Sequence, residues 1–240
     1  MFLRRDGRTP DQTREIKIEL GYLKYAEGSC LITAGDTKVL CAATFERKVP
    51  PFLVGSGQGW ITAEYNLLPR STQERTVREA TAGRVKGRNQ EIQRFLGRSL
   101  RAVCDLYALG ENQFIIDCDV LQADGGTRTM ALTGGFCALA SAVKKLLINK
   151  VLTKNPIIEN VAAISVGIVE EQILVDLSYE EDSKADTDMN VVITESGKIV
   201  EIQATAERIP FALDDFLKMF NLAKRAIAEI ILKQKAVCQG

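Results

Sequence analysis

Arginine side chains are concentrated in one stretch of this 240-residue chain, residues 70–101. Nine basic residues stand there against three acidic ones, a net charge of +6. Eight of the nine are arginine, whose planar guanidinium can form two parallel hydrogen bonds to a phosphate group. The nine are Arg70, Arg75, Arg78, Arg84, Lys86, Arg88, Arg94, Arg98 and Arg101. This Arg-rich segment points to a ligand that carries phosphate.

Carboxylates are concentrated in a second stretch, residues 170–188, where eight acidic residues stand against Lys184 alone and the net charge is −7. Within this acidic segment, Asp182 and Asp188 lie six residues apart. Two carboxylates brought together could hold Mg²⁺, or one could have its pKa raised enough to supply a proton. The segment lacks the EF-hand pattern, so a calcium site is not expected. The alternative is that the two charged segments are solvated faces that pair with each other.

Two adjacent glycines mark a third candidate, in the sequence QADGGTRT at residues 122–129, between a predicted strand and a predicted helix. Glycines let consecutive backbone N–H groups turn toward one point, and the following helix adds its own unpaired N–H groups and positive dipole end. Gly126, Thr127 and Arg128 therefore form a candidate cradle for one phosphate. The Walker pattern is absent, so binding of a nucleoside triphosphate is not indicated. A tight turn with a threonine cap is the alternative.

The composition excludes several classes of enzyme. The chain has no histidine, which excludes a Ser-His-Asp triad, a Cys-His dyad and a histidine-ligated metal. Its 31 basic and 31 acidic residues balance, which excludes a histone-like coating of nucleic acid but not a local basic patch. The six cysteines form no C-x-x-C pair, a usage typical of reduced thiols in a cytoplasmic protein. No apolar run reaches the roughly 18 residues of a membrane span, and the start lacks a signal-peptide core, so we expect neither membrane insertion nor export.

Hydrophobic patterning predicts an α+β fold, because strand runs and helices are both present without strict alternation. We expect one domain over residues 1–240, with an N-terminal arm at 1–14 and two similar halves at about 15–110 and 111–240. Strands are expected at 16–18, 30–32, 38–44, 60–65, 114–121, 161–169, 173–177, 189–194 and 199–204, and helices at 90–106, 132–147 and 213–232.

Four motifs together resemble the ribonuclease PH family: GQGWITAEYNLLPR at 57–70, GRNQEIQR at 87–94, DCDVLQADGGTRT at 117–129, and EDS at 181–183 with TDMNVV at 187–192. The resemblance covers nearly the whole chain. It implies a fold of two β-α-β-type halves, similar to the second domain of ribosomal protein S5, and a homohexameric ring that is a trimer of dimers. It also implies a phosphate-dependent 3′→5′ exoribonuclease, or tRNA nucleotidyltransferase, which trims the 3′ ends of tRNA precursors and other RNA and releases nucleoside diphosphates.

The resemblance also assigns roles to residues of this chain. Inorganic phosphate, the co-substrate, is expected at Arg88, Gly126, Thr127 and Arg128. Asp182 and Asp188 match the catalytic acidic pair, assigned to Mg²⁺ binding and proton transfer, and Arg70, Arg75 and Arg78 match a basic loop linked to tRNA binding. Two alternatives stay open: a catalytic subunit of an exosome-type RNA-degrading ring, and a non-catalytic RNA-binding subunit of such a ring.

Overall fold

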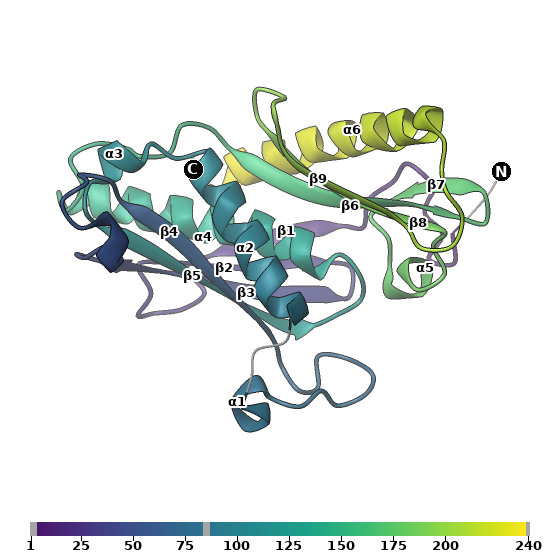
Figure 1. Cartoon of the computed structure of the whole chain (residues 1–240), viewed down its shortest axis with the longest axis horizontal. Helices are drawn as coiled ribbons and strands as arrows, with labels where there is room; N and C mark the ends of the chain where they lie inside the picture. The colour runs from purple at the N-terminus through teal and green to yellow at the C-terminus, as the bar shows by residue number, and fades with distance from the viewer. Residues whose placement is uncertain (1–3, 84–86, 239–240) are drawn as a thin grey trace.

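The structure, a computed structural model, describes residues 4–83 and 87–238. The first three residues of the N-terminal arm, and Arg84 and Lys86 of the Arg-rich segment, lie outside the described residues. The described chain forms two sheets with a long helix between them (Figure 1).

The first sheet contains five strands in the order β1-β2-β3-β5-β4. All neighbours are antiparallel except β4 and β5, which run parallel. The strands are β1 (Ile16–Leu20), β2 (Gly28–Ala34), β3 (Thr37–Glu46), β4 (Trp60–Leu67) and β5 (Gln113–Gln122). Alternate residues of β2, β3 and β5 are buried beneath helix α4 (Thr127–Ile148), and α2 (Gly87–Ala102) covers β4. Gly28 has no side chain, and this lets α4 lie directly against β2. A Cβ at this position would lie only 2.1 Å from the backbone oxygen of Ala138.

The second sheet contains four antiparallel strands in the order β7-β6-β8-β9. They are β6 (Val161–Val169), β7 (Gln172–Val175), β8 (Thr187–Thr194) and β9 (Ile199–Ala206). Strands β6 and β8 are buried almost throughout, because α4 and the C-terminal helix α6 (Leu213–Cys238) both pack on this sheet. The short helices are α1 (Glu79–Ala82), α3 (Leu106–Leu109) and α5 (Tyr179–Asp182), with a 3₁₀ turn at Pro51–Leu53.

Helix α4 is longer than the predicted helix at 132–147. By length and mean hydropathy, 1.5 over its best 18 residues, it could cross a membrane. However, 67% of that stretch is buried between the two sheets. A helix that is apolar all round is expected at such a position, so α4 is a core helix of this fold.

The α+β class is confirmed, and the largest errors in the bounds of the predicted elements lie at helix ends. Helix α4 begins at Thr127 rather than 132, and α2 spans 87–102 rather than 90–106. Leu106 belongs to the separate helix α3, whose N-cap Asp105 accepts hydrogen bonds from the N–H groups of Tyr107 and Ala108. The helical spacing of apolar residues continues in the sequence to Leu106, but the N-cap at Asp105 starts a new helix there.

Candidate active site

A cavity of about 590 Å³ is lined by residues of both sheets. It is bordered by the end of β4, the start of α2, the start of α4, and residues of β6 and β8. Seven of the predicted site residues line it: Arg78, Arg88, Gly126, Thr127, Arg128, Asp182 and Asp188. The structure therefore brings together the Arg-rich segment, the paired glycines and the acidic pair, which are far apart in the sequence.

The start of α4 is shaped by the glycine turn, residues 123–126. Gly125 and Gly126 both adopt left-handed backbone angles, with φ of 74° and 63°. A Cβ on Gly125 would lie 2.3 Å from the backbone oxygen of Leu177, so this turn packs against the acidic segment at a distance that only glycine permits. The helix ladder begins with the N–H of Met130, which donates to the Gly126 carbonyl at 3.0 Å. The N–H groups of residues 127–129 precede it and remain for a ligand.

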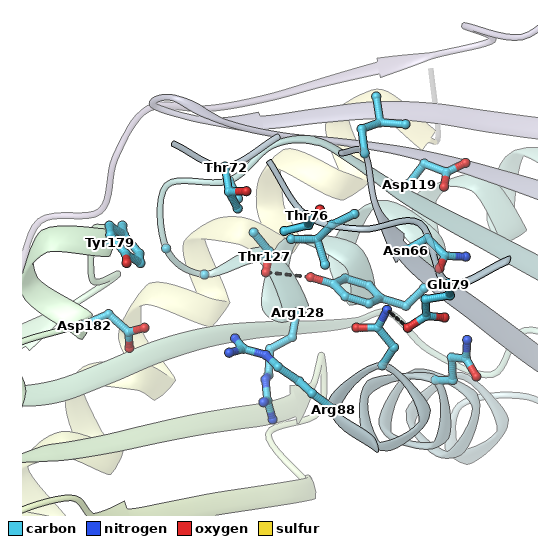
Figure 2. A pocket seen from close by; sticks show the side chains of 18 of the residues that line it. Asn66, Thr72, Thr76, Glu79, Arg88, Asp119, Thr127, Arg128, Tyr179 and Asp182 are labelled. Carbon is cyan, nitrogen blue, oxygen red and sulfur yellow. Dashed lines mark hydrogen bonds between the residues drawn. The ribbon is translucent and has the colours of Figure 1, made fainter. Parts of the chain in front are cut away.

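The Thr127 hydroxyl is held by a buried tyrosine rather than serving as a helix cap. The N-cap of α4 is Gly126. The hydroxyl of Tyr65, on β4, donates to Thr127 Oγ1 at 2.8 Å (Figure 2). Burial raises the pKa of Tyr65, while its hydrogen bond to Thr127 and the charges of Arg88 and Arg128 oppose that rise. The phenol therefore stays protonated and fixes the direction of the threonine hydroxyl.

Two guanidinium groups extend into the cavity, with Asp182 across from them (Figure 2). Arg88, the second residue of α2, makes no ion pair with any residue that the structure describes. Arg128 is held from two sides: it donates to Gln203 Oε1 at 2.6 Å, and its Nη2 lies 3.3 Å from Glu91 Oε2. One arginine is thus fixed in place and the other is free to meet an anion.

The two aspartates lie in an environment that disfavours their ionised forms. Burial raises the pKa of Asp182, although the positive charges of Arg88 and Arg128 act against it. For Asp188, burial together with the negative charge of Asp182 raises the pKa to about 6. Asn190 Nδ2 donates to Asp188 Oδ2 at 3.2 Å. A cation between the two carboxylates would relieve the repulsion that raises the pKa of Asp188.

The donor set is suited to Mg²⁺ that is shared with a substrate. Across residues 4–83 and 87–238, no cluster of three or more Asp, Glu or Cys side chains could hold a metal ion. Mg²⁺ commonly binds through one or two carboxylates and completes its shell with water and substrate phosphate oxygens. Asp182 and Asp188 fit that mode of binding but could not form an all-protein cage.

The basic loop is divided between the cavity and the surface. Arg70, Arg75 and Arg78 are all exposed, and only Arg78 lines the cavity. Arg70 and Arg75 lie in the loop between β4 and α1, which projects with α1 from the body of the molecule (Figure 1). These two arginines therefore face solvent beside the site rather than the reacting groups.

Sequence reasoning missed the residues that hold the site residues in place. Tyr65, Glu91 and Gln203 were not among the predicted site residues. The alternation of β4 could have placed Tyr65 on the buried face, because Ile61, Ala63 and Tyr65 alternate with more exposed neighbours. No sequence signal pairs Gln203 on β9 with Arg128 on α4.

Comparisons with known proteins identify the family of this chain. The model of the 3′ exoribonuclease family, domain 1, matches residues 12–145, and that of domain 2 matches residues 159–226. Ribonuclease PH of Moorella thermoacetica is 55% identical over 98% of this chain and 94% of its own length. Ribonuclease PH of Neisseria meningitidis serogroup B is 55% identical over 96% of both chains. A solved structure of the Archaeoglobus fulgidus exosome with RNA bound to the active site is similar in fold, with a TM-score of 0.79 and 21% identity over 96% of this chain and 92% of that one.

These matches define a class, the 3′ exoribonucleases built from these two family domains. Within that class, the chain belongs to the ribonuclease PH family. The predicted family, fold class and enzymatic activity are confirmed. The likeness to the exosome structure, at 21% identity, concerns the fold alone.

Proposed function

We propose that the cavity binds inorganic phosphate and the 3′ end of an RNA side by side, and that this juxtaposition performs the family's phosphorolysis. As a member of the ribonuclease PH family, the chain is a phosphorolytic 3′ exoribonuclease. The observation that supports this use of the cavity is its lining: Arg88, Arg128 and the start of α4 face the same space as Asp182 and Asp188.

The reaction needs little from the protein except position and charge. An oxygen of inorganic phosphate attacks the terminal phosphorus of the RNA, and the bond from that phosphorus to the preceding nucleotide's O3′ breaks. The electron pair stays on O3′, which takes up a proton, and a nucleoside diphosphate leaves. Phosphate is already an anionic nucleophile, so a chain without histidine can perform this step. Cations are needed to hold two negative groups in contact.

Each group in the cavity then has a distinct task. Arg88, Arg128 and the N–H groups at Gly126 and Thr127 hold the attacking phosphate. Asp182 and Asp188 would hold Mg²⁺, which when bound would neutralise charge on the reacting phosphates. These two carboxylates are among the acidic groups that line the cavity, and either one, when protonated, could supply the proton to O3′.

The RNA body would be bound outside the cavity. Arg70 and Arg75 are exposed on the projecting loop and Arg78 stands at the border of the cavity, an arrangement suited to contacts with successive backbone phosphates. We further propose that tRNA precursors and other RNA 3′ ends are the substrates, that the chain acts in the cytoplasm, and that it assembles as a homohexamer, a trimer of dimers.

One assay tests the reaction and the site together. The purified chain is incubated with a 3′-labelled RNA with and without phosphate, and the released mononucleotide is identified. Diphosphates that appear only with phosphate are expected, whereas monophosphates formed by water would contradict phosphorolysis. Activity without other subunits is also expected, since the family is that of ribonuclease PH; dependence on added ring subunits would favour an exosome-type role.

Substitutions then assign the groups. Loss of one comparable electrostatic contact costs about 10²–10³ in rate. We therefore expect Arg88→Met and Arg128→Met to lose phosphate-dependent release by that factor while RNA affinity changes little. Arg94→Met is the matched control, because Arg94 is exposed on the same helix as Arg88 but does not line the cavity. Asp182→Asn should lose its response to added Mg²⁺.

A further inference from the structure

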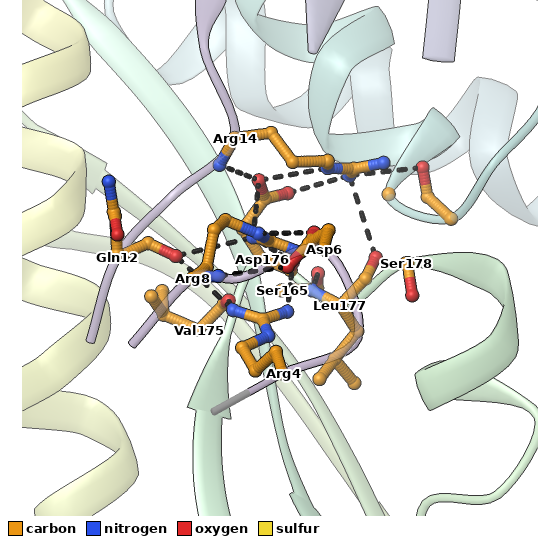
Figure 3. A network of polar contacts seen from close by, with 12 residues as sticks. Arg4, Asp6, Arg8, Gln12, Arg14, Ser165, Val175, Asp176, Leu177 and Ser178 are labelled. Atoms are coloured by element: carbon orange, nitrogen blue, oxygen red, sulfur yellow. Dashed lines mark hydrogen bonds and ion pairs between the residues drawn. The ribbon is translucent and has the colours of Figure 1, made fainter. Parts of the chain in front are cut away.

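A buried ionic network joins the N-terminal arm to the two loops that form the site (Figure 3). Its centre is Asp176, whose side chain is fully buried and which follows β7 with a positive φ of 54°. Arg14 meets both oxygens of this carboxylate: Nε donates to Oδ2 at 3.0 Å and Nη2 donates to Oδ1 at 2.7 Å. The backbone N–H of Arg14 adds a third bond, at 2.8 Å.

The same guanidinium also holds the glycine turn. Arg14 Nη1 donates to the carbonyl oxygen of Asp124, and Nη2 lies 3.4 Å from that of Gly125. The Thr37 hydroxyl, which accepts from Nη1 at 3.3 Å, donates to the Gly125 carbonyl at 2.7 Å. A Cβ on Gly126 would lie only 3.1 Å from Arg14 Nη2. The turn that starts α4 is therefore held by the side chains of Arg14 and Thr37.

The other side of the network reaches α5, the helix that carries Asp182. Arg4 donates to the Asp176 carbonyl at 2.8 Å and, through Nε, to Glu181 Oε1 at 2.6 Å. Glu181 completes the capping box of α5, the helix that ends at Asp182. The Tyr179 N–H, at the start of α5, donates to Asp124 Oδ1 at 3.2 Å. An unbroken set of contacts thus runs from the glycine turn to the helix of Asp182.

Stability alone does not account for this arrangement. A buried ion pair gains little over a well-packed apolar replacement, because both charges must be removed from water. What the planar fork of Arg14 provides is simultaneous contact with a carboxylate of one loop and carbonyl oxygens of another. We propose that Arg14 is a positioning residue, which holds the phosphate-binding turn at a fixed distance from the segment that carries Asp182. This inference rests on the proposed function of those two segments.

The test uses the full chain and compares Arg14→Lys with Arg14→Met. Lysine keeps a positive charge beside Asp176. Unlike the guanidinium of arginine, its single ammonium group cannot also reach the carbonyl oxygens of Asp124 and Gly125. We expect Arg14→Lys to unfold at a higher temperature than Arg14→Met, while both lose kcat/KM for phosphate by on the order of 10²-fold, the effect of a misplaced reacting group. RNA affinity, measured by fluorescence anisotropy, should stay within about twofold of wild type, because the exposed arginines are unaffected.

Arg8 provides the matched control. It is as buried as Arg14, with 7% against 6% of its surface exposed, and it donates to the Asp176 carbonyl at 3.0 Å. Within the part of the chain that the structure describes, Arg8 makes no hydrogen bond to the glycine turn. Arg8→Met should therefore lose stability with a much smaller change in kcat/KM for phosphate. An equal loss in Arg8→Met and Arg14→Met, or recovery of activity together with stability in Arg14→Lys, would overturn the proposal.

Two further measurements keep the result interpretable. Thr37→Val removes only the hydroxyl that bonds the turn, so this variant can be measured even if the Arg14 variants do not fold. Its KM for phosphate should rise several-fold. A KM equal to that of wild type would count against the positioning role of Arg14. Arg128→Met is measured in parallel. If Arg128→Met leaves phosphate use unchanged, the proposed site fails whatever the Arg14 variants do; if it impairs phosphate use, the Arg14 result stands on its own.

Discussion

Replacing Tyr65 with phenylalanine removes one hydroxyl and tests whether Thr127 is a ligand for phosphate. Tyr65 is 1% exposed, so water cannot easily take the place of its 2.8 Å bond to Thr127. A neutral hydrogen bond of this kind contributes about 0.5–1.5 kcal/mol, which corresponds to about 2- to 10-fold in an equilibrium constant. With Tyr65 as donor, the hydrogen of Thr127 is left for the ligand. We expect Tyr65→Phe to raise the KM for phosphate by that factor, with little change in RNA affinity.

The assay is release of nucleoside diphosphate from RNA over a phosphate titration, with Tyr179→Phe as control. Tyr179 lines the same cavity but is 55% exposed, and its hydroxyl makes no hydrogen bond to the residues that the structure describes. A double-mutant cycle with Thr127→Val isolates the pair, since Tyr65→Phe should have almost no effect once the threonine hydroxyl is gone. An unchanged KM in Tyr65→Phe, or the same loss with and without Thr127, would refute the reasoning.

Three further outcomes are expected. Gly125→Ala should destabilise the fold by more than about 2 kcal/mol in urea unfolding, because φ is +74° and the new Cβ would lie 2.3 Å from a backbone oxygen; a wild-type midpoint would contradict the tight packing of the turn. Burial opposes ionisation of Asp176, but hydrogen bonds and charge from Arg14 outweigh it and lower the Asp176 pKa below 3.8. The ionised carboxylate therefore stabilises the folded chain above pH 3.8, and this stabilisation is lost as the pH falls through the lowered pKa. The difference in unfolding free energy between wild type and Asp176→Asn should narrow only in that acidic range. Replacing both Arg70 and Arg75 with methionine should weaken RNA binding and reduce the slope of log K against log salt by about 1 per arginine, at an unchanged KM for phosphate.

The strand pattern was accessible from the sequence because it depends on local alternation. The strands expected at 30–32 and 38–44 appear as β2 and β3, a hairpin paired from Gly28 with Ala43 to Ala34 with Thr37. The predicted strand at 161–169 coincides with β6. Helix ends were less accessible, since the start of α4 at Thr127 depends on two left-handed glycines: Gly125 packs against residues 177 and 178, and Gly126 lies beside Arg14.

The division of the chain into halves remains a prediction. The sequence places the boundary near residue 110. The first sheet includes β5, at Gln113–Gln122, and α4 packs on both sheets. A helix shared by two sheets gives no composition shift in the sequence, so patterning along the chain does not by itself test this boundary.

The sequence by itself determined the chemistry available to this protein. Without histidine and with separate arginine-rich and acidic segments, the chain could bind phosphate and a divalent cation, and its motifs resembled one family. Residue types and local periodicity are properties of neighbouring residues, so they can be read along the chain.

Only the tertiary structure decided which of these residues meet. Of the seven basic residues between 70 and 101 that the structure describes, Arg78 and Arg88 line the cavity, whereas Arg98 pairs with Glu201 at 2.8 Å and Arg101 donates to the Ile61 carbonyl at 2.6 Å. All four are arginines in one charged stretch, and their different tasks follow from the side of α2 or the loop on which each lies. Contacts between residues far apart in the chain depend on how helices and sheets pack, and no local pattern records that packing.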